Sequence, residues 1–355
     1  MKAKKLSALL LAVVMIFSLA ACGSKTPKTD PNATRIFTDS TGREVEVPAQ
    51  IDKVALSGPL AQIVLFALCP DKLVGVSNAW SSEAQEFLDE KYFNMPQIGQ
   101  LYGGKGELNL ETLLQSGAQV VIDVGESKGS IKEDMDSLQQ QTGIPFVHIS
   151  ADMQSYPQAY RMLGDLLGMK TEAEALATYC EKIYSRTETI ASGVEKANVL
   201  YVTGDMGQNV IAKGSYHAEI LDMLTNNLAQ VDEPSSKGTG NEVSMEQILT
   251  WNPDVVIFAP ESIYAAVKDD AAWQSVTAIK NGAYYEVPFG PYNWMGFPPS
   301  VQRYLGMVWL SKLLYPDATA DYDLFADVQE YYKLFYHCDI TRAQYDALVA
   351  NSIRK

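Results

Sequence analysis

One short segment of the chain carries the residue types needed for nucleophilic chemistry. The run Gly125–Gly129 has the pattern G-x-S-x-G, in which a serine on a sharp strand-to-helix turn attacks an ester or amide. An apolar strand pattern precedes this run and a helical pattern follows it. Three histidines lie downstream, in the order that an α/β-hydrolase requires: His148, His217 and His337. The pattern therefore raises acyl transfer by Ser127 as a hypothesis.

A repeat in the same region argues against catalysis. Glu107–Ser127 returns at Glu242–Ser262 with a constant offset of 135 residues, and eight of the 21 positions are identical. The second copy keeps the pair Glu261-Ser262 but lacks flanking glycines, and no His-Gly-Gly loop is present for an oxyanion. The Glu-Ser pair therefore has a role that is common to both copies of the repeat. We expect no catalytic residue and no enzyme, and keep a serine hydrolase using Ser127 as a remote alternative.

The repeat also predicts the architecture. Each copy has the pattern of a short helix, a fully apolar strand and a loop at the strand's carboxyl end. Between the copies, Glu172–Ser192 contains neither Gly nor Pro and would form a helix of roughly 30 Å. We predict an α/β protein of two Rossmann-like lobes with central, mainly parallel sheets. One long α-helix joins the lobes, and a ligand cleft lies between them.

The amino terminus has the features of an export signal. Lys2, Lys4 and Lys5 precede the apolar run Leu6–Leu19, and Ala20-Ala21 stands before Cys22. The next residues are rich in Ser, Thr, Lys, Pro and Asn, a composition typical of a flexible tether. The predicted organisation is a signal peptide (1–21), a tether (22–34), an N-terminal lobe (35–170), an interlobe helix (171–193) and a C-terminal lobe (194–355).

Composition excludes several classes of function. The chain has 355 residues and a formal net charge of −15, so its surface should repel nucleic acid. Besides Cys22 it has only Cys69, Cys180 and Cys338, without a Cys-x-x-Cys pair. This spacing gives no support to a zinc site or to thiol redox chemistry, and whether any cysteines pair stays open. We expect no resident metal and no cofactor.

Several motifs together resemble one family. They are the Leu-Ala-Ala-Cys box, the segment TDSTGREVEVP at 38–48, and the helix segments NLETLL at 109–114 and SMEQIL at 244–249, each before a Val-Val-Ile strand. With the single long helix between the halves, the mature chain resembles the substrate-binding lipoproteins of ABC importers for iron chelates, haem, cobalamin and related metal compounds. The resemblance implies a ligand held between the lobes, with small closure.

The resemblance also implies a function and partners. We expect an extracytoplasmic lipoprotein, lipidated at Cys22 and anchored to a bacterial membrane. It would capture a metal-containing compound, first of all an iron(III)-siderophore type chelate, and deliver this cargo as a monomer to an ABC permease dimer and its ATPase. In the family, a glutamate on each lobe pairs with permease arginines, and these positions fall on Glu111 and Glu246. Haem, cobalamin or molybdate/tungstate binding, and a sensory lipoprotein, are the alternatives.

Residues on loops at the carboxyl ends of strands are the candidate ligand contacts. In the first lobe they are Ser57, Trp80, Tyr102, Lys105, Glu126 and Ser127, and in the second Asp205, Tyr216, His217, Glu261, Asn293, Trp294 and Phe297. The aromatic residues suit a flat or bulky ligand, and His217 could bind a metal or act as a proton switch. Lys105, Lys213 and Arg303 could neutralise an anion. The loops are not strongly basic, which disfavours a catecholate chelate and leaves hydroxamates, tetrapyrroles, corrinoids, or an oxyanion held by hydroxyls and N–H groups.

Overall fold

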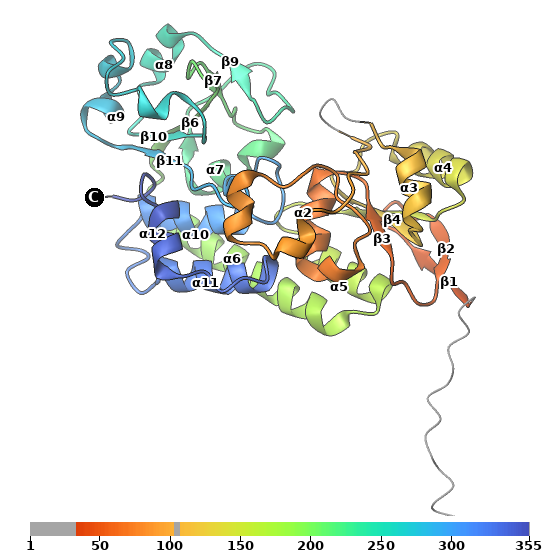
Figure 1. Cartoon of the computed structure of the whole chain (residues 1–355). Coiled ribbons are helices and arrows are strands. Elements are labelled where there is room, and N and C mark those ends of the chain that lie inside the picture. Colours follow the sequence, from red (N-terminus) through yellow and green to blue (C-terminus); the bar gives the residue numbers. More distant parts are fainter. Residues whose placement is uncertain (1–32, 103–106, 355) are drawn as a thin grey trace, which may run out of the picture.

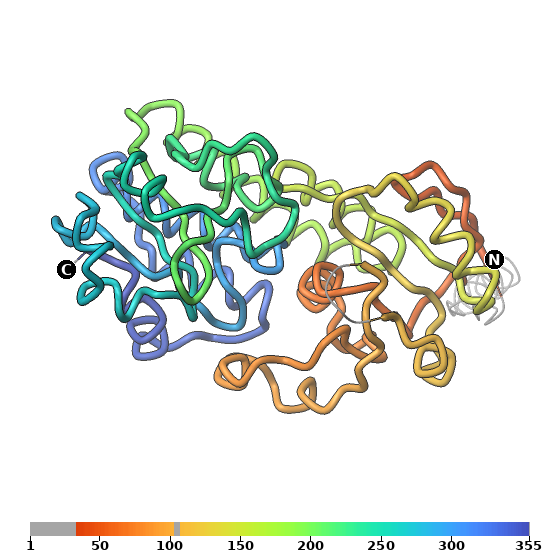
Figure 2. The backbone as a smooth tube through the Cα atoms, turned by 90° about the horizontal axis from the view of Figure 1, so that it is seen from above, coloured from red at the N-terminus to blue at the C-terminus, as the bar shows by residue number. Residues whose placement is uncertain are grey.

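The computed structural model describes residues 33–102 and 107–354. Two α/β lobes lie side by side and are joined by the helix α6 (Lys170–Gly193), with the chain running from one end of the molecule to the other (Figures 1 and 2). The predicted signal peptide, the lipidation site Cys22, most of the tether and Lys105 lie outside the described residues. None of the helices in the described part is long and apolar enough to cross a membrane.

The N-terminal lobe is built on a small parallel sheet. Its strands β3 (Val54–Leu56), β4 (Val120–Gly125) and β5 (Phe146–Ser150) are ordered β3-β4-β5. An antiparallel hairpin of β1 (Thr34–Thr38) and β2 (Glu44–Pro48) packs beside this sheet. The helices of the lobe are α2 (Pro59–Leu68), α3 (Leu110–Ser116), α4 (Ile131–Thr142) and α5 (Tyr156–Leu167), with short 3-10 turns at Pro70–Lys72, Ser82–Glu86 and Glu90–Tyr92.

The C-terminal lobe contains a second, mixed sheet. The strands β6 (Asn198–Thr203), β8 (Asn226–Asn227), β10 (Val255–Phe258) and β11 (Tyr284–Glu286) pair in parallel, while β7 (Asn209–Val210) and β9 (Asn241–Glu242) are antiparallel. The helices are α7 (Glu219–Leu224), α8 (Met245–Trp251), α9 (Thr277–Lys280), α10 (Arg303–Leu314), α11 (Leu324–Phe335) and α12 (Arg342–Leu348). Short 3-10 turns lie at Tyr216–Ala218, Ile263–Ala265 and Trp273–Ser275. The predicted class, two α/β lobes with mainly parallel sheets, is confirmed.

The sequence repeat is a structural repeat. Helices α3 and α8 occupy equivalent positions in the repeat, and each begins behind a polar cap, with Asn109 accepting from Thr112 N at 2.9 Å and Ser244 accepting from Gln247 N at 3.1 Å. Each helix ends at a residue with positive φ, Gly117 or Asn252. These caps satisfy helix-end groups that would otherwise lack partners. The strands β4 and β10 then begin at the two equivalent valines of the repeat.

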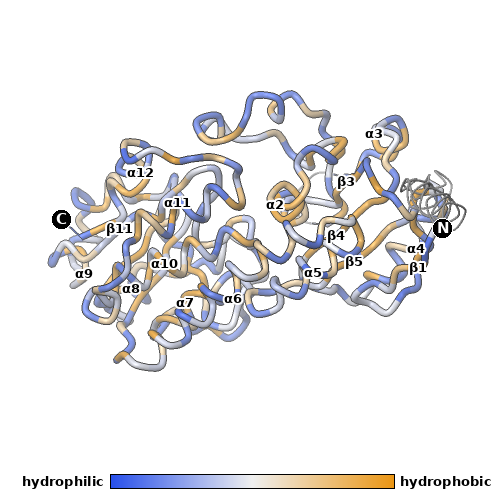
Figure 3. The backbone as a smooth tube through the Cα atoms, turned by 90° about the horizontal axis from the view of Figure 1, so that it is seen from below, coloured by the Kyte–Doolittle hydropathy of each residue, from blue (hydrophilic) through white to orange (hydrophobic). Residues whose placement is uncertain are grey.

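One hydrophobic cluster runs through both lobes, and each lobe has a further cluster of its own. Helix α6 packs against α5 on one side and against α7 and α10 on the other. Tyrosines fill the joint: Tyr179 and Tyr331 are buried, and the Tyr331 ring stacks on Phe335 with centroids 4.2 Å apart. At its outer face, Arg186 forms a two-pronged ion pair with Asp327 of α11, at 3.0 and 2.7 Å. The hydrophobic stretches follow β3, β5 and α2, whereas hydrophilic residues line the outer loops (Figure 3). The joint between the lobes is therefore closely packed and is also held by an ion pair.

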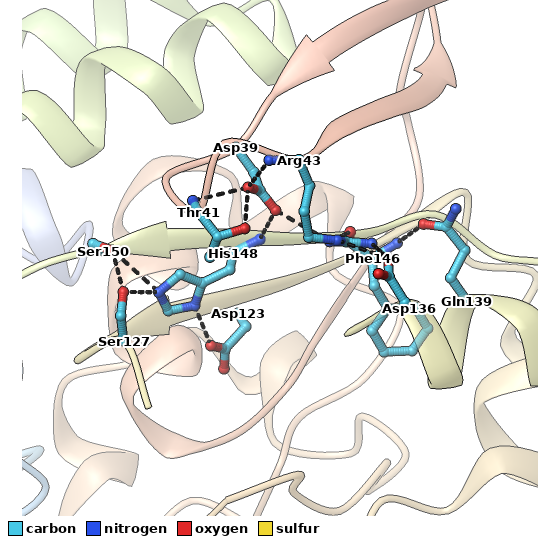
Figure 4. A network of polar contacts seen from close by, with 10 residues as sticks. All are labelled: Asp39, Thr41, Arg43, Asp123, Ser127, Asp136, Gln139, Phe146, His148 and Ser150. Atoms are coloured by element: carbon cyan, nitrogen blue, oxygen red, sulfur yellow. Dashed lines mark hydrogen bonds and ion pairs between the residues drawn. The ribbon is translucent and has the colours of Figure 1, made fainter. Parts of the chain in front are cut away.

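The turn between β1 and β2 is bonded to β5 through one buried carboxylate, that of Asp39. Asp39 accepts hydrogen bonds from the Thr41 N–H and hydroxyl at 2.9 and 2.7 Å, from the Arg43 N–H at 3.1 Å and from the His148 N–H at 3.4 Å (Figure 4). The Arg43 guanidinium lies 3.1 Å from the same carboxylate and donates to the Phe146 carbonyl at 2.9 Å. Burial alone would raise the pKa of Asp39, but these hydrogen bonds outweigh burial, so its pKa is lowered.

We predict that Asp39→Asn destabilises the protein most at neutral pH. The amide keeps the shape but removes the charge that four donors require, so we expect a loss of about 2–3 kcal/mol at pH 7. Because the folded-state pKa is lowered, the contribution of Asp39 is present above the unfolded-state pKa and is lost as the pH falls through the folded-state pKa. Urea unfolding between pH 7 and pH 3 should therefore show the gap between wild type and variant closing.

The matched control is Asp346→Asn, which removes an exposed ion pair to Arg342. It should cost less than about 0.5 kcal/mol, because exposed pairs are well solvated. A loss for Asp39→Asn that did not change with pH would contradict the electrostatic role given to this carboxylate.

Candidate functional site

Five polar residues gather at the carboxyl ends of β3, β4 and β5. His148 is fully buried, and its Nδ1 lies 2.6 Å from Asp123 Oδ2. Its Nε2 lies 2.9 Å from Ser127 Oγ and 3.2 Å from Ser150 Oγ, and the two hydroxyl oxygens are 2.5 Å apart (Figure 4). Ser57 donates a hydrogen bond to the other oxygen of Asp123. We call these five residues the serine–histidine cluster.

Strands β4 and β5 position the residues of the cluster. All six residues of β4 are buried because helices cover both faces of this sheet, so Asp123 reaches its partners inside the protein. Asp123 and His148 stand opposite each other in the parallel register of β4 and β5. The strand ends at Gly125, whose φ of +143° favours glycine. Glu126 and Ser127 then turn out to the exposed surface.

The second lobe reaches this cluster through Tyr216. The Tyr216 hydroxyl donates to the carbonyl of Ala151, the residue after Ser150, at 3.1 Å. A further hydrogen bond crosses between the lobes nearby, from the Tyr304 hydroxyl to the Met153 carbonyl at 2.7 Å. The segment directly after β5 is therefore in hydrogen-bond contact with Tyr216 and Tyr304 of the C-terminal lobe.

Arg303 lies behind Tyr216 and already has a carboxylate partner. Its guanidinium carbon is 4.8 Å from the centre of the Tyr216 ring, and Nη1 lies 2.9 Å from the Tyr216 carbonyl and 2.5 Å from Glu219 Oε2. The Arg303 side chain is fully buried. Burial raises the pKa of Glu219, against the opposing effect of the Arg303 charge. Arg303, which the sequence suggested could neutralise an anionic ligand, is thus already paired with Glu219.

Several predicted contacts hold loops in place. The Trp80 indole donates to the Tyr92 carbonyl at 3.0 Å and packs against Tyr292 of the other lobe. Trp294 has no exposed surface, and Asn293 is buried and donates to the Tyr201 hydroxyl at 3.2 Å. These contacts fix the loops that surround the site.

The remaining predicted residues range from buried to exposed. Tyr102 donates to Asp134, with Lys128 Nζ 4.6 Å above its ring. His217 is buried, its Nδ1 donates to the Gly296 carbonyl at 3.2 Å, and burial lowers its pKa. The exposed residues are Glu126, Asp205, Glu261 and Phe297.

Sequence reasoning missed Asp123 and Ser150, which the fold brings to this region, and also the exposed Met206 of the C-terminal lobe. Asp123 lies inside an apolar strand, and Ser150 ends the next strand, where the rule that ligands meet carboxyl ends of strands could have found it. Met206, in the loop after β6, exposes 72% of its surface. His148 was noted only as a hydrolase candidate, yet its ring is the centre of the cluster.

A separate hollow of about 770 Å³ lies between α6 and α11, away from the strand ends. Its lining includes Lys170, Glu174, Tyr179, Lys182 and Glu330. Within residues 33–102 and 107–354, no group of three or more His, Cys, Asp or Glu side chains is placed to hold a metal ion.

Comparison with known proteins gives these features a context. A family model described as "Periplasmic binding protein" matches residues 54–290. The molybdate-binding protein MolA of Haemophilus influenzae is 24% identical over 348 residues, covering 90% of this chain and 95% of that protein. The uncharacterized ABC transporter substrate-binding lipoprotein YvrC of Bacillus subtilis is 24% identical over 297 residues, covering 79% and 88%.

A solved structure confirms the fold. The ABC transporter solute binding protein from Sulfurospirillum deleyianum superimposes with a TM-score of 0.81 at 26% identity, over 89% of this chain and 99% of that one. The order Asp123–His148–Ser127 resembles a hydrolase triad in its hydrogen bonds, but fold relatives and family are solute-binding proteins. The expectation of a non-enzyme is confirmed, and the chain belongs to the periplasmic binding protein family of ABC transporters.

Proposed function

We propose that this protein captures a metal-containing compound outside the cytoplasm and delivers it to the permease of an ABC importer. One observation supports the proposed location of the cargo: Tyr216 of one lobe is hydrogen-bonded to Ala151 of the other, directly after Ser150 of the serine–histidine cluster. Hydroxyl and imidazole groups at the carboxyl ends of parallel strands, faced by a second lobe, form the kind of site in which α/β proteins hold small ligands.

The chemistry of this site favours a compact cargo with oxygen acceptors. Ser127 and Ser150 bring two hydroxyl groups together, and the Tyr216 hydroxyl of the opposite lobe donates to the carbonyl of Ala151, the residue after Ser150. Tetrahedral oxyanions are held in proteins by such neutral donors and by N–H groups. Similarity to a molybdate-binding protein over 90% of the chain supports the same class. Our first candidate is therefore a molybdate or tungstate type oxyanion.

An iron(III)-siderophore type chelate is the second candidate, because apolar side chains are exposed in loops of the C-terminal lobe. Phe297 exposes 56% of its surface and Met206 exposes 72%, and such side chains offer contact area to an organic ligand. Glu126, Asp205 and Glu261 are also exposed, so a neutral or cationic chelate fits better than a highly anionic one. A bulky chelate would also require the Tyr216–Ala151 hydrogen bond to open.

We predict that Ser127→Ala combined with Ser150→Ala weakens molybdate binding at least tenfold. Each hydroxyl would donate to a charged oxygen, and such hydrogen bonds contribute about 1.5–3 kcal/mol. Isothermal titration of wild type and variant with molybdate, and in parallel with a ferric hydroxamate, measures both candidates.

The matched control is Ser137→Ala, an exposed serine on α4 of the same lobe, which should leave affinity unchanged. Visible absorbance and native mass spectrometry of freshly purified protein would identify any retained cargo. Equal molybdate affinity in the double variant and wild type would place the cargo elsewhere.

The two glutamates of the repeat are our proposed permease contacts. Glu111 and Glu246 are exposed and lie in the first turns of α3 and α8, at equivalent positions of the two lobes. A pair of carboxylates spaced by the lobe repeat suits a permease dimer with one basic patch on each subunit. We further propose that cleavage before Cys22 and lipidation of its thiol keep the protein beside that permease.

We predict that Glu111→Ala with Glu246→Ala abolishes uptake of the cargo into cells while the affinity of the purified protein stays unchanged. The physical reason is that both side chains point to solvent and contact no group of the serine–histidine cluster. Cellular uptake of labelled cargo and titration of the purified variant provide the two measurements.

As a control, Glu133→Ala with Glu172→Ala removes two other exposed first-turn glutamates and should leave uptake intact. Loss of affinity together with uptake would show that Glu111 and Glu246 do not dock the permease. Ligand binding without any uptake by wild-type protein would favour a sensory lipoprotein instead.

A further inference from the structure

We propose that the protonation state of His148 decides whether the serine hydroxyls of the serine–histidine cluster can donate hydrogen bonds to a ligand. An oxyanion then binds together with one proton, which is taken up on His148 Nε2. This inference rests on the oxyanion cargo proposed above. It assigns to His148 a role in positioning hydrogen atoms for the ligand, through Ser127 and Ser150.

The first step is that one ring nitrogen is committed to a proton. Asp123 Oδ2 lies 2.6 Å from Nδ1, and a carboxylate can only accept, so Nδ1 carries hydrogen. The Ser57 hydroxyl donates to the other Asp123 oxygen and holds the carboxylate in this orientation. In the neutral ring Nε2 therefore presents a lone pair towards the two serines (Figure 4).

The second step is a count of hydroxyl hydrogens. Ser127 and Ser150 have two in total. With a neutral ring, one hydrogen is needed for the bond to Nε2 and the other for the 2.5 Å contact between the two hydroxyls. Neither hydrogen is left for a ligand, so the cluster presents only oxygen lone pairs, which repel an oxyanion.

Protonation of Nε2 reverses this arrangement. The ring then donates to a serine oxygen, one hydroxyl hydrogen still joins the two serines, and at least one hydroxyl hydrogen is freed to point outward. The ring also gains a positive charge next to the bound anion. Both changes favour an oxyanion, so by linkage the anion and the proton must bind cooperatively.

The groups around His148 are compatible with a positive charge on its ring that is present only when the ligand is bound. Asp123 from β4 accepts from the ring, whereas Asp39 from the β1–β2 turn meets only the backbone N–H and is paired with Arg43. The pKa of Tyr102 is raised by burial and by its hydrogen bond to Asp134 of α4, with a smaller contribution from the charge of Asp123. An imidazolium would therefore sit between the Asp123 carboxylate and the anion, with both of its N–H groups bonded.

The experiment is titration with sodium molybdate between pH 7 and 8.5, using two buffers of different ionisation enthalpy. We expect uptake of about one proton per anion, and an affinity that falls by up to tenfold for each unit of pH. Nitrogen-15 NMR of the wild-type histidine ring should show Nε2 changing from a lone-pair to an N–H signal when molybdate is added.

Variants separate His148 from other groups. His148→Gln should remove both the proton uptake and the pH dependence, whereas His337→Gln should keep both, because that ring lies 3.2 Å from the Phe66 carbonyl, outside the cluster. His148 is fully buried, so Ser127→Ala with Ser150→Ala provides a second route: proton uptake should vanish while the His148 ring remains.

Two outcomes would overturn the inference, and they differ. Molybdate binding without proton uptake and without an Nε2–H signal would refute the role of His148 but leave the oxyanion cargo standing. Absence of binding of molybdate and tungstate at every pH tested would remove the oxyanion cargo, and this inference with it.

Discussion

The packed joint along α6 is the constraint on which the rest of the structure depends. This helix of 24 residues packs against elements of both lobes, and its Arg186 is tied to α11. Because interiors are close-packed, two lobes that share one core cannot slide freely over each other. Ala151, the residue that follows β5, is therefore held within hydrogen-bond distance of Tyr216. A small rotation about this joint would open or close the site, whereas a large one would break the shared core.

We propose that the serine–histidine cluster uses a catalytic arrangement of atoms for binding. Its Asp–His–Ser hydrogen bonds follow the order of a hydrolase triad. Ser127 is also bonded to a second serine, and the cluster faces a partner lobe in a family of solute-binding proteins. The same fold carries many functions, so the role must be argued from the site and its surroundings. Here the imidazole and the hydroxyls are best explained as groups that orient hydrogen atoms for a cargo.

Repeated local patterns were the part of the fold that sequence could predict. The capped helices α3 and α8, and the strands that follow them, appear where the repeat places them, because caps and apolar periodicity act within a few residues. The predicted helix Glu172–Ser192 is found as Lys170–Gly193. The start differs by two residues and the end by one, and the helix begins before Thr171, without a side-chain cap.

The composition of the site was harder to predict because it depends on contacts between distant segments. Asp123 and His148 meet only through the register of two parallel strands, and chain order does not reveal that register. Arg303 acquires Glu219 as a partner through the packing of α10 on α7. Trp294 looked like a loop aromatic available to a ligand, yet the fold buries it. Tertiary burial decides such cases, and a single sequence contains little information about it.

The most direct test of the proposed site is a crystal structure of the protein with its cargo, located by anomalous scattering of the metal. Molybdenum, tungsten and iron can each be identified in this way without prior choice of ligand. Our account predicts the metal between the Ser127–Ser150 pair and Tyr216. A metal found in the hollow between α6 and α11, or on an outer face of either lobe, would contradict it.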